Sequence, residues 1–380
     1  MPEPLGAQEI QALLDDDTVL LAYTLSHERS YLWLVERHSI RGFCLAPRAQ
    51  IETLAERYYS LLTRPSQDPE LVRRQAAEGR DLARELLGPI AARLGRRRLV
   101  FLLDGKLNAV PFGTLPDPSF PDDREAPPLL ANHEISYLPS ASVLPVLRQR
   151  LAKPEWIPRT VAVFADAVYN RDDDHLPIGE PGSTSLGAWD FSPLPGSGRE
   201  ADAILDLVDR VASLSVRGFD ATRETLLKTD FSRYRIVHLA VHGVLDENPW
   251  FSRLVLSEYN QRGQRHNGGV MLHDIYQLDI PVDLVVLSAC DTARGKEVRG
   301  EGIVGLPRGF LYAGAARVVV SLWKVDDDAT AELMKSFYRE MLVEGRPPAA
   351  ALRAAQLNLR RRPGWETPRY WAGFVLQGAW

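Results

Sequence analysis

The chain has 380 residues, enough for one large or two ordinary domains with a sizeable core. With 45% hydrophobic and 25% charged residues it has the composition of a soluble globular protein, and its net charge of −5 disfavours a general nucleic-acid-binding surface. Its two cysteines exclude a disulfide framework, and no apolar stretch approaches the roughly 18 residues of a membrane span. Because the N-terminus also lacks the pattern of a signal peptide, the sequence predicts a cytoplasmic protein with no membrane or direct nucleic-acid partner.

The region before residue 155 combines strand and helix patterns. The apolar segments 19–24 and 31–36 predict an antiparallel pair of strands. The other expected elements are, in chain order, helices at 49–64 and 70–95, a strand at 99–104, a loop at 112–128, a strand at 133–138 and a helix at 141–151. The segment 153–158 then predicts a boundary, which divides the chain into residues 1–155 and 156–380.

Beyond that boundary strands and helices alternate regularly. The expected strands are 160–165, 213–217, 234–241, 253–257, 283–288, 316–322 and 371–376, and the expected helices are 199–211, 221–229, 272–277, 303–313, 328–344 and 347–361. The stretch 166–198 is too long for a plain connection and predicts a mobile or functional loop. The alternation predicts an α/β fold with a mainly parallel central sheet flanked by helices.

Two chemically reactive side chains follow strands of this predicted sheet. His242 comes directly after the strand 234–241, and Cys290 closely follows the strand 283–288. If these strands are parallel neighbours, both side chains emerge at the sheet edge where α/β proteins bind ligands. A thiolate is a nucleophile, and an imidazole can take its proton and later protonate a leaving amine. The pair therefore predicts the catalytic dyad of a cysteine peptidase, and its separation of 48 residues is close to the spacing of about 50 in caspases.

Each of the two residues also has a structural interpretation. Taken alone, Cys290 could be a small buried hydrophobe and His242 a hydrogen-bonded core histidine. Their order and their placement after two strands favour the catalytic interpretation. Gly243 allows a sharp turn beside the histidine, so we expect the backbone amides of Gly243 and Cys290 to form an oxyanion hole.

Other patterns around the dyad carry less information. His238 lies four residues before His242 and predicts a core or supporting group. A zinc site has no recognised ligand spacing here, although its candidate ligands would be His238, His242, His266, His273 and Cys290. The segment 300–305 (GEGIVG) matches the G-x-G-x-x-G dinucleotide pattern, but about a dozen residues separate it from the preceding strand. The sequence therefore predicts neither a metal nor a nucleotide cofactor.

Several motifs occur in a fixed order along the chain. They are VPFGTLPD (110–117), ISYLPSAS (135–142), HLAVHG (238–243), LSACDTA (287–293), GEGIVGL (300–306), FLYAGA (310–315), VVSLWKVDDDAT (319–330) and YWAGFVLQG (370–378). This series resembles the CHAT domain, a family named for its association with caspases and TPR repeats. The resemblance implies a caspase–hemoglobinase-like fold related to separase, with a non-catalytic half (1–155) and a catalytic half (156–380). It maps the family's catalytic pair onto His242 and Cys290; Val241 departs from the threonine often found before the histidine.

The resemblance implies a cysteine endopeptidase that cleaves a specific protein partner under the control of a TPR-type or other regulator. In bacteria it implies a role in defence or cell death. The alternative is a catalytically silent scaffold that only binds proteins. Peptidases of this fold commonly select the P1 residue through a charged S1 pocket, so Asp291, Asp326, Asp327 and Asp328 are candidates to favour Arg or Lys there. The last three could instead cap the helix that follows them.

Overall fold

The computed structural model describes residues 4–64, 68–120, 126–152, 159–170, 173, 175, 191–244, 246, 248–288 and 301–380. The strands of its large sheet are β1 (Thr18–Thr24), β2 (Ser30–Glu36), β3 (Ser39–Leu45), β4 (Arg98–Leu102), β5 (Ile135–Tyr137), β6 (Arg159–Ala167), β7 (Ser213–Gly218), β8 (Tyr234–Leu239), β12 (Leu284–Leu287), β13 (Arg317–Ser321) and β14 (Phe374–Gly378). They lie in the order β3-β2-β1-β4-β5-β14-β13-β12-β8-β6-β7.

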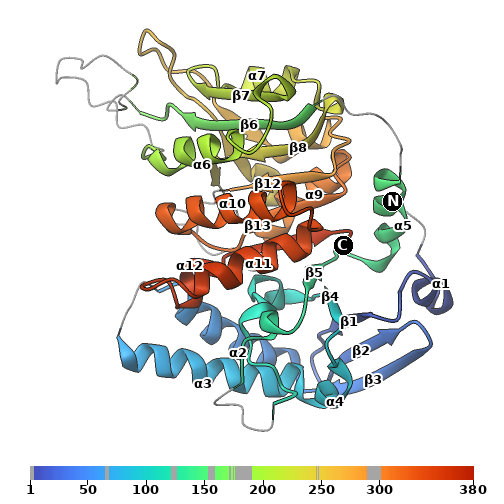
Figure 1. The fold of residues 1–380 in the computed structure, drawn as a ribbon. Coiled ribbons are helices and arrows are strands. Elements are labelled where there is room, and N and C mark those ends of the chain that lie inside the picture. Colours follow the sequence, from blue (N-terminus) through green and yellow to red (C-terminus); the bar gives the residue numbers. More distant parts are fainter. Residues whose placement is uncertain are drawn as a thin grey trace.

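Most neighbouring strands of this sheet are parallel. Among the described strands, the antiparallel neighbours are β1 with β2, β2 with β3, and β13 with β14. The predicted α/β fold with a mainly parallel sheet is therefore confirmed. The last strand, β14, pairs with β13 on one side and β5 on the other, so both halves of the chain contribute to one sheet (Figure 1). The predicted boundary at 153–158 lies outside the described residues.

Central strands of the sheet are apolar because helices cover both of their faces. Val285 and Val286 of β12 and Val318 and Val319 of β13 are fully buried. Burying each such side chain contributes about 1.5–3 kcal/mol. These runs are what made the strands recognisable in the sequence.

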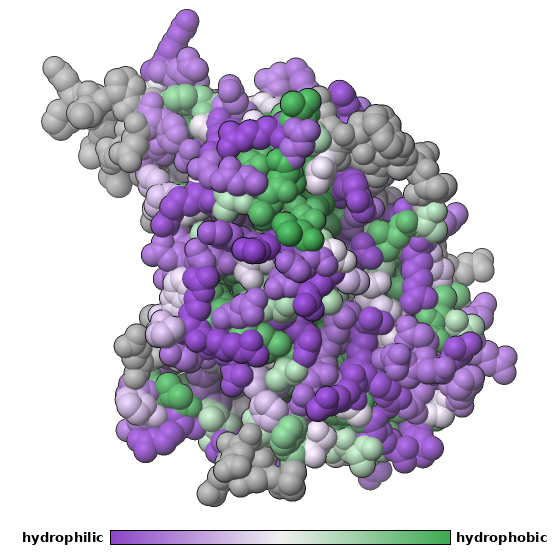
Figure 2. Space-filling view, viewed as in Figure 1, coloured by the Kyte–Doolittle hydropathy of each residue, from purple (hydrophilic) through white to green (hydrophobic). Residues whose placement is uncertain are grey.

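Helices form a layer on each face of the sheet. Their bounds are α1 (Ala7–Ala12), α2 (Arg48–Leu62), α3 (Pro69–Leu86), α4 (Ala91–Leu94), α5 (Leu144–Leu151), α6 (Pro195–Leu205), α7 (Arg223–Lys228), α8 (Leu272–Tyr276), α9 (Glu301–Ala313), α10 (Asp327–Leu342), α11 (Pro348–Arg360) and α12 (Pro368–Trp371). α10 packs between α6 and α11 in front of the sheet in Figure 1, whereas α8 and α9 pack together behind it. The exposed side of the front layer is mainly hydrophilic in Figure 2, as expected for amphipathic helices.

Several elements differ from the sequence predictions, and three of them show why. Strand β3 was not predicted, because its residues are largely exposed at the sheet edge and lack an apolar alternation. The helix expected at 70–95 ends at Leu86, since Gly88 and Pro89 start a 3₁₀ turn there. The strand expected at 234–241 ends at Leu239, and residues His242–Val244 form β9 in a separate antiparallel sheet with β10 (Arg253–Val255) and β11 (Gly269–Met271).

No helix in the described part of the chain is both long enough and apolar enough to cross a bilayer.

Candidate active site

The strands that precede the two predicted catalytic residues are parallel neighbours. In the register of β8 and β12, His238 lies opposite Val286 and Leu239 opposite Leu287. The ladder continues past β12, because the amide of Ser288 donates a hydrogen bond to the carbonyl of Leu239 over 2.9 Å. The predicted pairing is thus confirmed, and both strands end at the same edge. Cys290 and Asp291 themselves lie outside the described residues.

His242 is held rigidly at this edge. Its residue is 1% exposed, and its ring packs edge-on against Tyr169 at 4.6 Å and tilted against Phe191 at 5.0 Å between centroids. The backbone amide of His242 also donates to the Tyr169 hydroxyl over 3.3 Å. Two aromatic rings from the described ends of the predicted functional loop 166–198 therefore fix the orientation of the imidazole.

A backbone carbonyl determines the tautomer of His242. Nε2 of the ring lies 2.8 Å from the carbonyl oxygen of Ser192, and only a protonated nitrogen can donate to that oxygen. In the neutral ring the other nitrogen, Nδ1, then carries the lone pair that can accept a proton. Sequence reasoning missed Ser192, since every residue has a carbonyl and none is marked by its side chain.

Beside His242 lies a small cavity of about 40 Å³. Its buried wall includes the carboxylate of Glu200 and the hydroxyl of Ser288, which lies two residues before Cys290 in the sequence. Lys324 and Asp327 line the same cavity and are exposed, so they lie at its mouth. The cavity therefore combines an imidazole, a buried acid and a pair of opposite charges at its entrance.

The structure separates the three neighbouring candidate S1 acids. Asp326 caps α10, because its carboxylate accepts the amide of Ala329 at 3.0 Å. Asp328 forms an exposed ion pair with Arg199 at 2.6 Å. Asp327 alone of the three lines the cavity with His242. Its pKa is raised above the usual value, chiefly by partial burial and then by the neighbouring Asp326 carboxylate.

The remaining predicted groups take the following places. Gly243 lies in β9 opposite Leu254 of β10. His238 is fully buried beside Glu200 and Tyr338, as its supporting role predicts. Among the described residues no three His, Cys, Asp or Glu side chains converge as metal ligands would. Residues 301–305 of the glycine motif belong to α9, while Gly300 lies outside the described residues.

Glu200 was not among the predicted site residues. It lies on α6 one turn before the buried Ile204 and next to Ala201, so its charge interrupts the apolar face of an amphipathic helix. A charged residue in register with the buried face was the signal that could have identified it.

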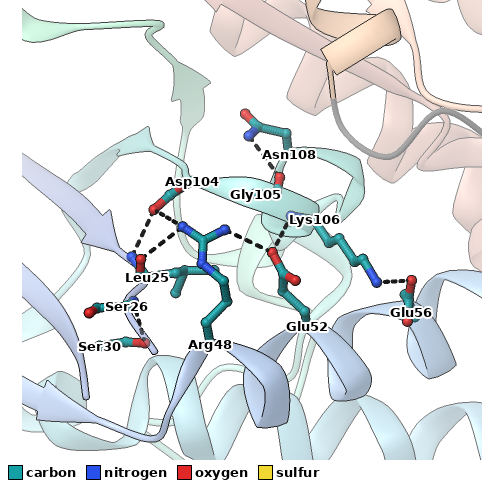
Figure 3. Close-up of polar contacts among 10 residues, drawn as sticks. All are labelled: Leu25, Ser26, Ser30, Arg48, Glu52, Glu56, Asp104, Gly105, Lys106 and Asn108. Atoms are coloured by element: carbon teal, nitrogen blue, oxygen red, sulfur yellow. Dashed lines mark hydrogen bonds and ion pairs between the residues drawn. The ribbon is translucent and has the colours of Figure 1, made fainter. Parts of the chain in front are cut away.

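The corresponding edge of the N-terminal half is filled by ion pairs. Arg48 on α2 donates to Asp104 at 3.0 Å, just after β4, and to Glu52 at 3.1 Å (Figure 3). Asp104 in turn accepts the amide of Leu25, just after β1, at 2.8 Å, and Lys106 pairs with Glu56. Every charged side chain in this network has a partner of opposite sign, as in a structural cluster.

Comparison with solved structures defines the class of fold. Over 98% of its length the chain is similar to a chain of the Saccharomyces cerevisiae separase–securin complex, with a TM-score of 0.54, 11% sequence identity and 30% of that chain covered. This likeness and the mainly parallel sheet identify a caspase-like α/β fold.

The family is shown by residues 76–379, which match the CHAT domain model, so the chain belongs to the CHAT family. It is similar to tetratricopeptide repeat protein 28 of Homo sapiens, at 26% identity over 77% of this chain, and of Mus musculus, at 28% identity over 53% of this chain. The chain spans 12% of the human relative and 9% of the mouse relative.

Proposed function

We propose that the chain is a cysteine endopeptidase in which His242 and Cys290 form the catalytic dyad. The observation that carries the proposal is the placement of His242 beside the ends of β8 and β12, with Nε2 bound to the Ser192 carbonyl. That contact leaves Nδ1 as the proton acceptor of the neutral ring. Cys290 follows the end of β12 by three residues in the sequence.

The proposed reaction follows from this arrangement. His242 takes the proton of the Cys290 thiol, and the thiolate attacks the carbonyl carbon of the scissile bond to form a tetrahedral oxyanion. Backbone amides of Gly243 and Cys290 stabilise that oxyanion. The imidazolium then protonates the leaving amine, and water hydrolyses the resulting thioester with His242 as the base. The Ser192 carbonyl stabilises the imidazolium through both steps.

The decisive experiment measures cleavage of a panel of fluorogenic peptides and of candidate partner proteins. Cys290→Ala should abolish cleavage while the circular dichroism spectrum stays unchanged. Cys44→Ala is the matched control, because Cys44 is exposed in the N-terminal half and should leave cleavage intact. Cleavage that survives Cys290→Ala would show that the dyad is wrong. A folded wild type that cleaves nothing, with an unreactive Cys290 thiol, would favour the alternative of a binding scaffold.

Among the candidate S1 acids, we propose that Asp327 favours a basic side chain at P1. A basic P1 side chain that enters the mouth of the cavity would meet the Asp327 carboxylate. The carboxylate of Asp326 caps α10 instead, and that of Asp328 forms an exposed ion pair with Arg199. Asp327→Asn should lower kcat/KM for peptides with Arg or Lys at P1 by roughly tenfold, the value of one charged hydrogen bond. Asp328→Asn is the control and should change it little, since an exposed ion pair contributes little. Equal rates for basic and neutral P1 residues in the wild type would exclude this specificity.

A further inference from the structure

Glu200 places a carboxylate in the protein interior, in the wall of the cavity beside His242. The residue is 3% exposed and lies on the side of α6 that packs onto the sheet. A charged carboxylate at such a depth costs several kcal/mol unless donors or opposite charges surround it. Its contacts therefore indicate what the carboxylate does in the fold.

Both oxygens of the carboxylate have a polar neighbour. Oε2 accepts a hydrogen bond from the Ser288 hydroxyl at 2.9 Å, at the end of β12. Oε1 lies 3.1 Å from Nε2 of His238 on β8, within ion-pair distance but without hydrogen-bond geometry. The other ring nitrogen of His238 lies 3.0 Å from the hydroxyl of Tyr338 on α10. Four buried side chains thus join α6, β8, β12 and α10.

This network is attached to both segments that carry the proposed dyad. His238 lies four residues before His242, and Ser288 lies two residues before Cys290. We propose that Glu200 is a positioning residue, which holds the ends of β8 and β12 together so that the thiol and the imidazole meet. The inference rests on the proposed function of the dyad, and it assigns to Glu200 no contact with substrate.

The position of the carboxylate also gives the expected sign of its effect. An adjacent imidazolium ion stabilises a thiolate, and a nearby negative charge favours that charged form of the ring. Glu200 lines the same cavity as His242, so its charge acts on the ring while its hydrogen bond holds Ser288. Removing the carboxylate should therefore make the Cys290 thiol less reactive, beyond any loss of stability.

The test measures the alkylation rate of Cys290 by iodoacetamide in the folded, full-length chain, with peptide mass spectrometry as the readout. The chain contains two cysteines, and the exposed Cys44 serves as the reference within each sample. Glu200→Gln should slow Cys290 relative to Cys44 by about tenfold, as misplacement of a reacting group does. Ser288→Ala removes only the hydrogen bond and should slow it by about threefold.

Two further variants separate the possible outcomes. Glu52→Gln removes an ion-paired carboxylate from the N-terminal half and should leave the Cys290 rate unchanged. His242→Ala should slow Cys290; if it does not, the dyad of the proposed function is wrong. If His242→Ala slows the thiol but Glu200→Gln leaves it equal or faster, the positioning role of Glu200 is overturned. If Glu200→Gln does not fold, Ser288→Ala provides the test. An unchanged alkylation rate of Cys290 in Ser288→Ala would then overturn the positioning role of Glu200.

Discussion

At the scale of single residues, the ion-pair network of the N-terminal half requires a glycine at position 105. Gly105 has a φ of +57°, and a Cβ atom there would lie 2.3 Å from Oε1 of Glu52 and 2.8 Å from Nη1 of Arg48. Gly105→Ala should therefore lower the free energy of unfolding by roughly 3 kcal/mol, through backbone strain of about 1–2 kcal/mol and displacement of the ion pair. Urea denaturation measures this change.

Gly345→Ala is the control for that prediction. Gly345 has a φ of +69°, but nothing lies within 4 Å of the added Cβ, so only the backbone term applies. Gly345→Ala should lower the free energy of unfolding by about 1–2 kcal/mol. Equal losses in the two variants would mean that the network of Arg48, Glu52 and Asp104 adds nothing to the requirement for glycine at position 105.

His175 is a second residue whose contribution to stability can be tested, because that contribution should depend on pH. Its ring lies 2.6 Å from Asp173 and 3.2 Å from Asp166, and the hydrogen bond to Asp173 is the main cause that raises its pKa above the usual value. A raised pKa in the folded state stabilises the fold below the unfolded pKa of about 6.5, and this contribution disappears as pH rises through the folded pKa. His175→Gln should thus destabilise the protein at pH 5.5 and less so at pH 9. Urea denaturation at both pH values measures the free energy of unfolding. If His175→Gln differs from wild type by the same amount at pH 5.5 and pH 9, the raised pKa of His175 does not contribute to stability.

At the scale of elements, the close approach of α6 and α10 depends on Gly196. A Cβ atom at this position would lie 3.0 Å from Cβ of Asp327 and 3.3 Å from its carbonyl oxygen. At Gly198, two residues further along α6, the nearest atom is 3.5 Å away, an ordinary contact. Both changes to alanine gain helix propensity of up to about 1 kcal/mol, but only Gly196→Ala must push the two helices apart.

Urea denaturation of the two glycine variants tests this packing. Gly198→Ala should be neutral or stabilising, and Gly196→Ala should be less stable than Gly198→Ala by about 1 kcal/mol or more. In a peptidase assay Gly196→Ala should also alter cleavage, since Gly196 lines the cavity with His242 and Asp327. Indistinguishable stabilities would show that α10 relaxes around the added methyl group without cost.

The individual elements also show how much of the fold and of the site could be predicted from the sequence alone. The buried strands β12 and β13 were predictable because they contain continuous apolar runs. The parallel pairing of β8 with β12 was the condition on which the predicted dyad depended, and the structure supplies it. Edge strand β3 was missed because solvent covers much of it and leaves no apolar pattern. The contact of His242 with the Ser192 carbonyl joins residues 50 apart through a backbone atom, so no residue type could reveal it. The choice of Asp327 over Asp326 and Asp328 depends on which way three adjacent side chains point, which spacing does not determine.

At the scale of the whole molecule, the two halves of the chain are joined by more than their covalent connection. β14 pairs with β5, the hydroxyl of Tyr59 on α2 donates to the carbonyl of Leu322 at 2.9 Å, and Arg150 on α5 donates to the carbonyl of Leu311 at 2.6 Å. Each contact links residues 1–155 to residues 156–380. The large sheet would be cut open between β5 and β14 if the halves separated, which would expose two strand edges.

We therefore predict that residues 1–155 and 156–380, produced together as separate chains, assemble into one complex that co-elutes in size-exclusion chromatography. Each half produced alone should aggregate, because the unpaired edges of β5 and β14 are then free to pair with other copies. Tyr59→Phe is the control, since it removes one hydrogen bond of about 1 kcal/mol and should leave the complex intact. Two halves that elute apart as folded monomers would contradict the prediction, because the shared sheet would then contribute too little to hold them together.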